Sequence, residues 1–553
     1  MTVNRPAQRA IRAAIAGLTW EPPDAGEWEF DGLHQAEPAS ATLQELFPTA
    51  SRIGFAEAFA RYGLPLSHME IRYVNGWAYL SPFVHGARRT PSRKPAAPVL
   101  LKLLTRWSPS ARRRTKAARA AIDNDVAIAE IERWDVLRPR WIERNLEFQD
   151  VDLEACTDAE LGDQVRLTAA HFAEGATIHF ALISQVIPIG EYLVRTAEWG
   201  IDPKIAGKAA FHGVRSSAEG RRRLAAIADA LGEAVVHDLD QVRLHSAQAA
   251  AALDDYLRHH GSWVLSDDIV GETLAELPDV VLRTIERHRG GVSDEQPDVE
   301  AAVDACRYAV PHGQGPSFDR LLARAQRAYA ALDDNSGLLA SWPGGLVRRT
   351  QREAARRLTD RGVLGGLDDV FVLRSGEIAA LLNGAADPGP DEIAERLVLR
   401  EAQGSVTPPA HLGSPPSAPP DPSLFPEPVA QHVCHFGAFL SAKFGDGLDT
   451  AFGIGNEPVT GTAVVAASPV EALERVEPGD VLITTFTTPA FNVIMPILGG
   501  IVTISGGPNS HTAVVARELG ISAVIGVADA LERIPDGAVV TVDPVAATVT
   551  VCT

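Results

Sequence analysis

The sequence predicts a multidomain protein with a mainly α-helical N-terminal domain and a C-terminal α/β domain. Three observations support this fold class: alanine-rich stretches with apolar residues every three or four positions, a proline-rich segment, and short β-rich runs beyond residue 450. At 553 residues the chain is also too long for one hydrophobic core. We therefore expect a helical domain at 1–403, a linker at 404–428 and an α/β domain at 429–553.

Helical periodicity is strongest between residues 120 and 290. Within it, the segment 221–250 repeats apolar residues at three- and four-residue spacing, which is typical of a packed amphipathic helix. Two further helices are expected at 317–332 and 345–361. Several long helices should therefore form the core of the N-terminal domain.

Strand patterns are sparse before residue 450. The clearest lies at 71–80, where two short alternating runs flank Asn75-Gly76 and predict a β-hairpin. The segment 404–428 is crowded with proline, glycine and serine and is interpreted as a semi-extended tether. Beyond it, strands that alternate with a few helices are expected at 462–466, 481–485, 501–504, 523–525 and 539–542.

Composition and charge exclude several classes of protein. The chain is 46% hydrophobic and 22% charged, as in soluble globular proteins, and its net charge of -20 argues against bulk attraction to nucleic acid or an anionic membrane. Arginines interrupt the first 20 residues where a signal peptide needs an apolar core, so a cytoplasmic location is expected. The cysteines lie too far apart to indicate a disulfide framework: Cys156, Cys306, Cys434 and Cys552.

The most informative motif is SGGPNSHTAVVARELG at 505–520. An apolar strand-like run enters a glycine turn, and a polar segment with one histidine opens a helix that Gly520 can close. His511 therefore lies at a helix N-terminus, where free N–H groups and the helix dipole favour an anion. This placement suits a phosphoryl group carried on the imidazole.

With these residues, the segment resembles the mobile phosphohistidine domain of the phosphoenolpyruvate-utilising superfamily, which includes phosphoenolpyruvate synthase, pyruvate phosphate dikinase and rifampin phosphotransferase. The resemblance covers about a hundred residues and extends to GNEPVTGTAVV at 455–465 and to the Thr487-Thr488-Pro489 turn. Three positions depart from the family pattern, all outside the Ser-His pair: Ile504, Ser522 and Pro544.

The resemblance implies that His511 is phosphorylated and that its domain swivels between distant sites. Few basic residues follow residue 450, so local phosphate binding is expected from backbone amides and hydroxyls. The candidates are Gly506, Gly507, Ser510, Thr512 and Thr488.

The region before the linker is similar to the helical acceptor-binding domain of rifampin-phosphotransferase-like enzymes. The motifs include Asn75-Gly76-Trp77-Ala78-Tyr79 and Gly366-Leu367-Asp368-Asp369-Val370-Phe371, in the family's order. This resemblance implies an acceptor cavity with cations from Arg348, Arg349 and Arg352 and a proton acceptor among Asp268, Asp333 and Asp334. Ordinary alternatives stay open: a solvated helix face for the arginines, and caps or salt bridges for the aspartates. The relatives' His-Arg pair aligns imperfectly with His259-His260.

Related enzymes carry an ATP-grasp module that charges the histidine from ATP. No such module and no Gly-x-x-x-x-Gly-Lys loop is recognised in this chain, and the phosphoenolpyruvate-binding barrel is not recognised either. The resemblance therefore implies a split system, similar to phenylphosphate synthase, in which a separate ATP-grasp protein charges His511. ATP and Mg²⁺ would be used through that partner, with no cofactor bound by this chain. The triplet His432-x-Cys434-His435 lacks the fourth ligand of a zinc site, so no metal is expected.

The expected function is that of a phosphotransferase subunit that passes a phosphoryl group from His511 to a hydroxyl of a small molecule. The phosphate ester is either the product or the leaving group of a net dehydration. Two alternatives from other classes remain: a non-catalytic homologue that binds a ligand or partner, and a lyase or isomerase that uses the helical cavity without phosphate.

Overall fold

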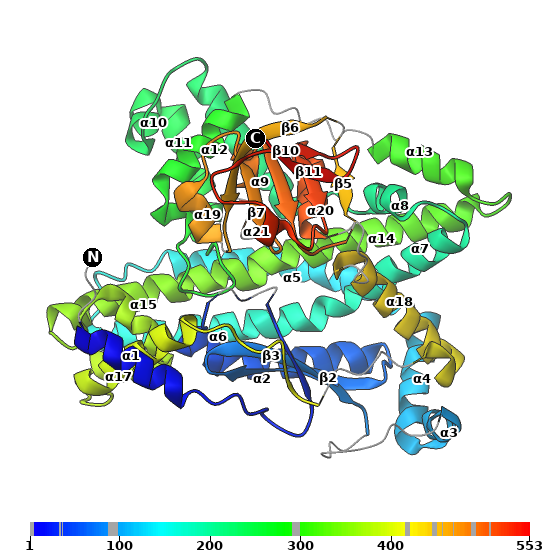
Figure 1. Cartoon of the computed structure of the whole chain (residues 1–553), viewed down its shortest axis with the longest axis horizontal. Helices are drawn as coiled ribbons and strands as arrows, with labels where there is room; N and C mark the ends of the chain where they lie inside the picture. Colours follow the sequence, from blue (N-terminus) through cyan, green and yellow to red (C-terminus); the bar gives the residue numbers. More distant parts are fainter. Residues whose placement is uncertain are drawn as a thin grey trace.

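The computed structural model describes most of the chain, and Figure 1 shows its arrangement. The described residues are 5–32, 35, 37–86, 98–289, 299–414, 421–444, 451–455, 457–467, 469–487, 491, 494–507 and 510–552. The predicted site residue Thr488 lies outside the described residues, and so does part of the predicted linker.

The N-terminal part is mainly helical, as predicted. Its longer helices pack side by side in Figure 1, and apolar residues at helical spacing form the contacts between them. The helices are α1 (Arg5–Gly17), α2 (Ala41–Arg61), α3 (Pro98–Trp107), α4 (Pro109–Asp123), α5 (Val126–Gln149), α6 (Asp158–Leu182), α7 (Val186–Glu198), α8 (Pro203–Ala210), α9 (Arg215–Leu231), α10 (Leu239–His245), α11 (Ala247–His260), α12 (Pro278–Arg289), α13 (Val299–Ala309), α14 (Gly315–Ser336), α15 (Trp342–Asp360), α16 (Ser375–Leu382), α17 (Pro390–Gly404) and α18 (Glu427–Phe444).

The predicted hairpin is confirmed. Strands β2 (Leu66–Val74) and β3 (Trp77–Val84) pair antiparallel across a two-residue turn, and both turn residues, Asn75 and Gly76, have positive φ. This is the backbone that a two-residue hairpin turn requires. The sheet is completed by β1 (Glu27–Phe30) and β4 (His411–Gly413), in the order β2-β3-β1-β4.

The two helices predicted at 317–332 and 345–361 form one continuous rod. α14 runs directly into a π-helical turn, Gly337–Ser341, and then into α15. Pro343 does not end the rod, and it lies where the π-helical turn passes into α15. Asp333 therefore lies in the last turn of α14 and not in a loop after it.

One helical stretch has the length and composition of a membrane span, among the residues that the structure describes. It covers Asp158–Glu198, which includes α6 and α7, and slightly more than half of its apolar window is buried inside the protein. A buried core helix of a soluble protein meets the same criterion, so this stretch is weak evidence for a membrane.

The segment around the predicted linker packs on the helical domain. β4, at 411–413, pairs with β1, and α18 packs along α7 and α4 (Figure 1). Phe439 of α18 is buried in the cluster formed by α7, α8 and α14. The sequence analysis assigned residues from 429 onward to the α/β domain, but α18 packs on the helical domain. The reason is that α18 buries its apolar face against the helices that precede the linker.

The C-terminal domain is the predicted α/β layer. Its sheet has the order β11-β10-β6-β7-β8-β9-β5, and the central strands β6 to β9 are parallel. The strands are β5 (Phe452–Ile454), β6 (Val459–Val465), β7 (Val481–Thr484), β8 (Gly500–Thr503), β9 (Ser522–Ile525), β10 (Val539–Asp543) and β11 (Thr548–Val551), and the helices are α19 (Pro469–Arg475), α20 (His511–Leu519) and α21 (Ala530–Arg533). Every residue of β7, β8 and β9 is buried, as in parallel strands covered on both faces.

The C-terminal domain is docked on the helical domain. Figure 1 shows its sheet beside α9 to α12 and above the long rod of α14 and α15. One hydrophobic cluster joins the two domains, with Leu224 of α9 and Val281 of α12 on one side and Phe452, Ile494 and Met495 on the other. Apolar burial of this kind stabilises the docked arrangement.

Candidate active site

His511 opens α20 as the motif predicts. The hydroxyl of Ser510 caps the helix by accepting the Ala513 N–H, and Gly520 ends it in the left-handed conformation. The turn that leads from β8 to the helix uses Gly506 at φ +128°, where a Cβ would lie 3.0 Å from the Ser510 hydroxyl oxygen. The glycine turn therefore brings His511 to the carboxyl edge of the parallel strands, where α/β proteins bind ligands.

The His511 imidazole is held by a pair of threonines. Its Nδ1 lies 3.0 Å from the Thr487 hydroxyl, and that hydroxyl lies 2.7 Å from the Thr512 hydroxyl. If Thr487 donates to Thr512, Nδ1–H must donate to Thr487, which leaves the lone pair on Nε2. Nε2 is shielded from solvent and has no hydrogen-bond partner among the described residues.

Thr487 is a site residue that the sequence interpretation did not select; Thr488, which it selected, lies outside the described residues. The signal was available in the strand pattern. Thr487 follows β7 and His511 follows β8, and these neighbouring strands are parallel, so their carboxyl ends meet at one edge.

The surroundings keep the imidazole neutral. Burial, followed by the nearby Lys443 ammonium, lowers the pKa of His511 to about 3. The ring is therefore uncharged at physiological pH, and Nε2 is available as a nucleophile.

Lys443, near the end of α18, is a second site residue that sequence reasoning did not find. Its backbone carbonyl accepts the Gly507 N–H at 3.1 Å, which ties the glycine turn to the helical domain. Burial lowers the pKa of the Lys443 ammonium, and the carboxylates of Asp333 and Asp267 oppose that shift. No motif marks this lysine, because only domain docking brings α18 to His511.

Of the three aspartates predicted for the acceptor site, Asp333 is the one that lies near Lys443. Burial raises its pKa to about 6, Lys443 lowers it, and Asp334 adds to the rise. Lys443 is thus the electrostatic neighbour of both Asp333 and His511.

The predicted phosphate-binding residues lie around His511, and several are already engaged. Ser510 and Thr512 are fully buried, the first as the helix cap and the second in its contact with Thr487. The Gly507 N–H is used by Lys443, and the Ser510 N–H donates to the Gly507 carbonyl. In this docked arrangement the local donors therefore hold the loop together.

The arginines predicted for the acceptor site do not converge. Arg348 is buried, forms two hydrogen bonds to the Glu276 carboxylate and also donates to backbone carbonyls. Arg349 donates to the carbonyls of Phe148, in the last turn of α5, and Val151, and Arg352 pairs with Asp368. Each guanidinium thus ties α15 to a different neighbouring segment. The three arginines therefore form neither a shared anion site nor a solvated helix face.

Two of the three predicted aspartates have structural partners. Asp334 is fully buried and accepts hydrogen bonds from Arg138, from the Trp134 indole and from the Ser216 N–H. Asp268 accepts from the backbone N–H and the hydroxyl of Ser40, the N-cap of α2. The salt-bridge and capping alternatives therefore describe these two positions.

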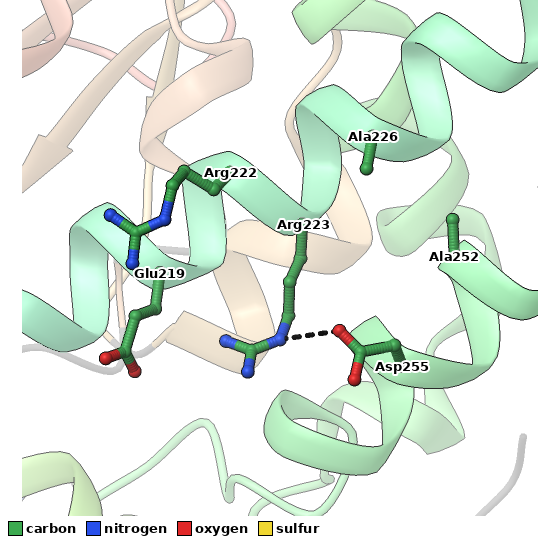
Figure 2. Close-up of a pocket in the computed structure, with 6 residues that line it drawn as sticks. All are labelled: Glu219, Arg222, Arg223, Ala226, Ala252 and Asp255. Carbon is green, nitrogen blue, oxygen red and sulfur yellow. Dashed lines mark hydrogen bonds and ion pairs between the residues drawn. The ribbon is translucent and has the colours of Figure 1, made fainter.

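A separate open cleft of about 360 Å³ lies between α9 and α11 (Figure 2). Arg223 pairs with Asp255 across it at 2.9 Å, and the adjacent Arg222 lies on the same helix. Its lining consists of Glu219, Arg222, Arg223, Ala226, Ala252 and Asp255. The cleft contains none of the predicted site residues.

Three histidines outside the motif are engaged by neighbouring groups. His432 has its Nδ1 2.7 Å from the Tyr62 carbonyl, and His259 has its Nδ1 2.9 Å from the Asp255 carbonyl. His260 is largely enclosed by aromatic rings, and burial lowers its pKa to about 3. Within the described ranges, no group of three histidine, cysteine or acidic side chains has the arrangement of a metal site.

Comparisons with known proteins agree with this geometry. Residues 476–546 match the family model of the PEP-utilising enzyme, mobile domain. The chain is 51% identical over 73 residues to phosphoenolpyruvate synthase of Escherichia coli, covering 13% of this chain and 9% of that protein. It is 46% identical over 84 residues to the same enzyme of Aeropyrum pernix, covering 15% and 10%.

A longer match extends beyond the mobile domain. The chain is 33% identical over 188 residues to rifampicin phosphotransferase of Streptomyces sviceus, which covers 33% of this chain and 19% of that protein. The chain therefore spans between about a tenth and a fifth of the length of these curated relatives. The C-terminal domain is a mobile domain of the phosphoenolpyruvate-utilising enzyme superfamily, in a chain that is similar to rifampicin phosphotransferase over part of its length.

Proposed function

We propose that this protein is a phosphohistidine-dependent phosphotransferase in which His511 accepts a phosphoryl group and passes it to a hydroxyl of a small molecule. One observation carries the proposal: Nε2 of a neutral imidazole, at a helix N-terminus in a mobile domain of this superfamily, has no partner within the described part of the chain. A buried polar atom without a partner is costly, and at the histidine of the mobile-domain motif we interpret it as the reacting nitrogen.

The threonine pair suits both chemical steps. Nε2 attacks the phosphorus of the donor while Nδ1–H stays hydrogen-bonded to Thr487. When the phosphoryl group leaves, the electron pair of the P–N bond returns to Nε2, and the ring again becomes neutral imidazole. The ring therefore needs no proton transfer in either step.

The donor is proposed to be ATP, acting through a separate ATP-grasp protein that also handles Mg²⁺. The acceptor is proposed to be a small hydroxylated compound, by analogy with the rifampicin phosphotransferase that this chain matches in part. The ester is the final product in one version of the proposal. In the other, phosphate is the leaving group of an elimination.

The test is radiolabelling. Wild-type protein is incubated with γ-labelled ATP and an ATP-grasp protein encoded beside it, and acid-labile label is expected on the chain. His511→Ala should abolish the label, whereas His312→Ala, which removes an exposed histidine, should keep it. Absence of label with every ATP-grasp protein tried would favour a binding homologue, and an activity that survives His511→Ala would favour a lyase or isomerase.

A further inference from the structure

Two contacts join the glycine turn and α20 to helices that precede the C-terminal domain. The Gly507 N–H donates to the Lys443 carbonyl at 3.1 Å, so the glycine turn is tied to the end of α18. Val514, three residues after His511, packs in the cluster that includes residues of α14 and Phe439 of α18. The segment that carries His511 is therefore packed beside α14 and the C-terminal end of α18.

A cation and two carboxylates gather at the same place. The Lys443 ammonium is the electrostatic neighbour of His511, Asp333 and Asp267, which come from three different segments. A buried ammonium is costly unless anions compensate it. The two carboxylates provide part of that compensation, and an incoming dianionic phosphoryl group would provide more.

We propose that this junction is the acceptor-side transfer centre, where the Lys443 ammonium binds the phosphoryl oxygens on His511 Nε2 and the Asp333 carboxylate takes the proton of the acceptor hydroxyl. The inference rests on the proposed phosphotransferase function. It assigns the catalytic cation to α18, whereas the sequence resemblance had placed the acceptor-site cations in the arginines of α15.

The step balances without an additional reactant. The acceptor oxygen attacks phosphorus, the P–O bond forms, and the P–Nε2 bond breaks with its electron pair returning to the imidazole. The hydroxyl proton moves to Asp333, and Nδ1–H stays on Thr487. Lys443 reduces the repulsion between the phosphoryl dianion and the approaching oxygen.

The charges also indicate the class of acceptor. Asp333 and Asp267 would repel a substrate that carries a carboxylate or phosphate next to the reacting hydroxyl. The centre therefore suits neutral or cationic alcohols and phenols. This restriction separates it from sites that use anionic metabolites such as phosphoenolpyruvate.

The experiment separates discharge from charging. Each protein is loaded to equal stoichiometry with potassium phosphoramidate, which transfers its phosphoryl group to imidazole and releases ammonia. After the reagent is removed, ³¹P NMR follows the loss of phosphohistidine in a methanol–water mixture, and methyl phosphate is measured as a product. The variants are Lys443→Met and Asp333→Asn, each compared with wild type.

Both variants should discharge at least about tenfold more slowly than wild type at neutral pH, since each removes a group that acts in the transition state. Lys443→Arg should restore part of the rate because it keeps the charge. Lys204→Met is the matched control for the lysine, since Lys204 lies over the Phe452 ring at the same domain junction. Asp319→Asn is the control for the aspartate, because Asp319 lies on the same helix and pairs with Arg307. Both controls should discharge as wild type does.

The pH profile distinguishes a reacting carboxylate from a structural one. Formation of methyl phosphate by wild type should fall as pH drops through about 6, where Asp333 becomes protonated. Asp333→Asn should lack this step, and Lys443→Met should move it to higher pH because Lys443 lowers that pKa against the effects of burial and Asp334.

Equal discharge by wild type, Lys443→Met and Asp333→Asn would overturn the inference. The proposed function fails in a different way, through absence of label from ATP, which the phosphoramidate experiment does not use. The two failures are therefore distinguishable.

Discussion

The Thr487 hydroxyl lies 3.0 Å from Nδ1 of His511, so Nε2 is the ring nitrogen that has no hydrogen-bond partner among the described residues. Thr487 follows β7 and His511 follows β8, so the contact joins the ends of two parallel strands. Together with Thr512 it forms a fully buried chain of polar groups behind the nucleophile.

Thr487→Val should therefore slow phosphorylation of His511 by roughly tenfold, because the valine cannot accept the Nδ1–H bond and leaves a buried donor unpaired. The measurement is the initial rate of acid-labile labelling from ATP. Thr485→Val is the matched control, since the Thr485 side chain is exposed just after the same strand. Equal rates for Thr487→Val and wild type would contradict the role given to this hydroxyl.

Gly506→Ala should disturb the same turn through the backbone. Gly506 has φ +128°, and its new Cβ would lie 3.0 Å from the hydroxyl that caps α20. The strain should cost roughly 1–3 kcal/mol and displace His511 from Thr487. Thermal unfolding and labelling should both be impaired. Gly376→Ala, which has open space for a Cβ, should change neither.

The buried ion pairs predict large losses of stability at positions that do not react. Asp334→Asn leaves Arg138 without its buried carboxylate, and Arg348→Met leaves Glu276 without its two hydrogen bonds. Each change should lower the free energy of unfolding by about 3–5 kcal/mol, as measured by urea denaturation. Arg356→Met is the control, because its side chain is half exposed. If the Arg348→Met protein were stable but lost phosphotransfer, the result would support a role for Arg348 in the acceptor site.

Acid should destabilise the protein through its buried histidines. Burial lowers the pKa of His171, His260 and His511 to about 3, so the unfolded chain binds protons below pH ~6.5 while the folded chain does not. Stability should therefore fall as pH drops from about 6.5 toward 4, by up to about 1.4 kcal/mol per pH unit for each histidine.

Asp333 has the opposite effect on how stability changes with pH. Its raised pKa favours the protonated folded state, so it opposes the three histidines only between pH ~6 and ~4. Urea denaturation midpoints across this range test the balance. His171→Gln should flatten the pH dependence without affecting phosphorylation, because His171 is stacked between Trp141 and Phe148 and lies in a separate cluster of helices. A midpoint that rises on acidification would contradict the assignment.

Local patterns in the sequence were enough to predict the hairpin and the positions of the central strands along the chain. A period of two residues, a two-residue turn and continuous apolar runs are properties of neighbouring residues, and they do not depend on distant packing. The position of His511 followed in the same way, since Gly506, Ser510 and Gly520 specify the turn, the start and the end of its helix.

The long helices were predicted less well at their ends. The rod formed by α14 and α15 continues through residues 337–341, because burial of Leu338, Leu339 and Trp342 outweighs the local tendency of glycine and proline to end a helix. The packing of α18 was missed for a similar reason, since its partners α4 and α7 lie more than two hundred residues earlier.

The sequence by itself determined the reactive group, the turn that presents it and the class of domain that carries it, because these depend on contiguous residues. Only the tertiary structure decided which charges face that group. Arg348, Arg349 and Asp334 carry suitable charges but are held by partners within the helical domain, whereas Lys443 lies near His511 because docking brings the C-terminal end of α18 to the glycine turn. Charge is a property of the residue, but its partner is set by the packing of the whole chain.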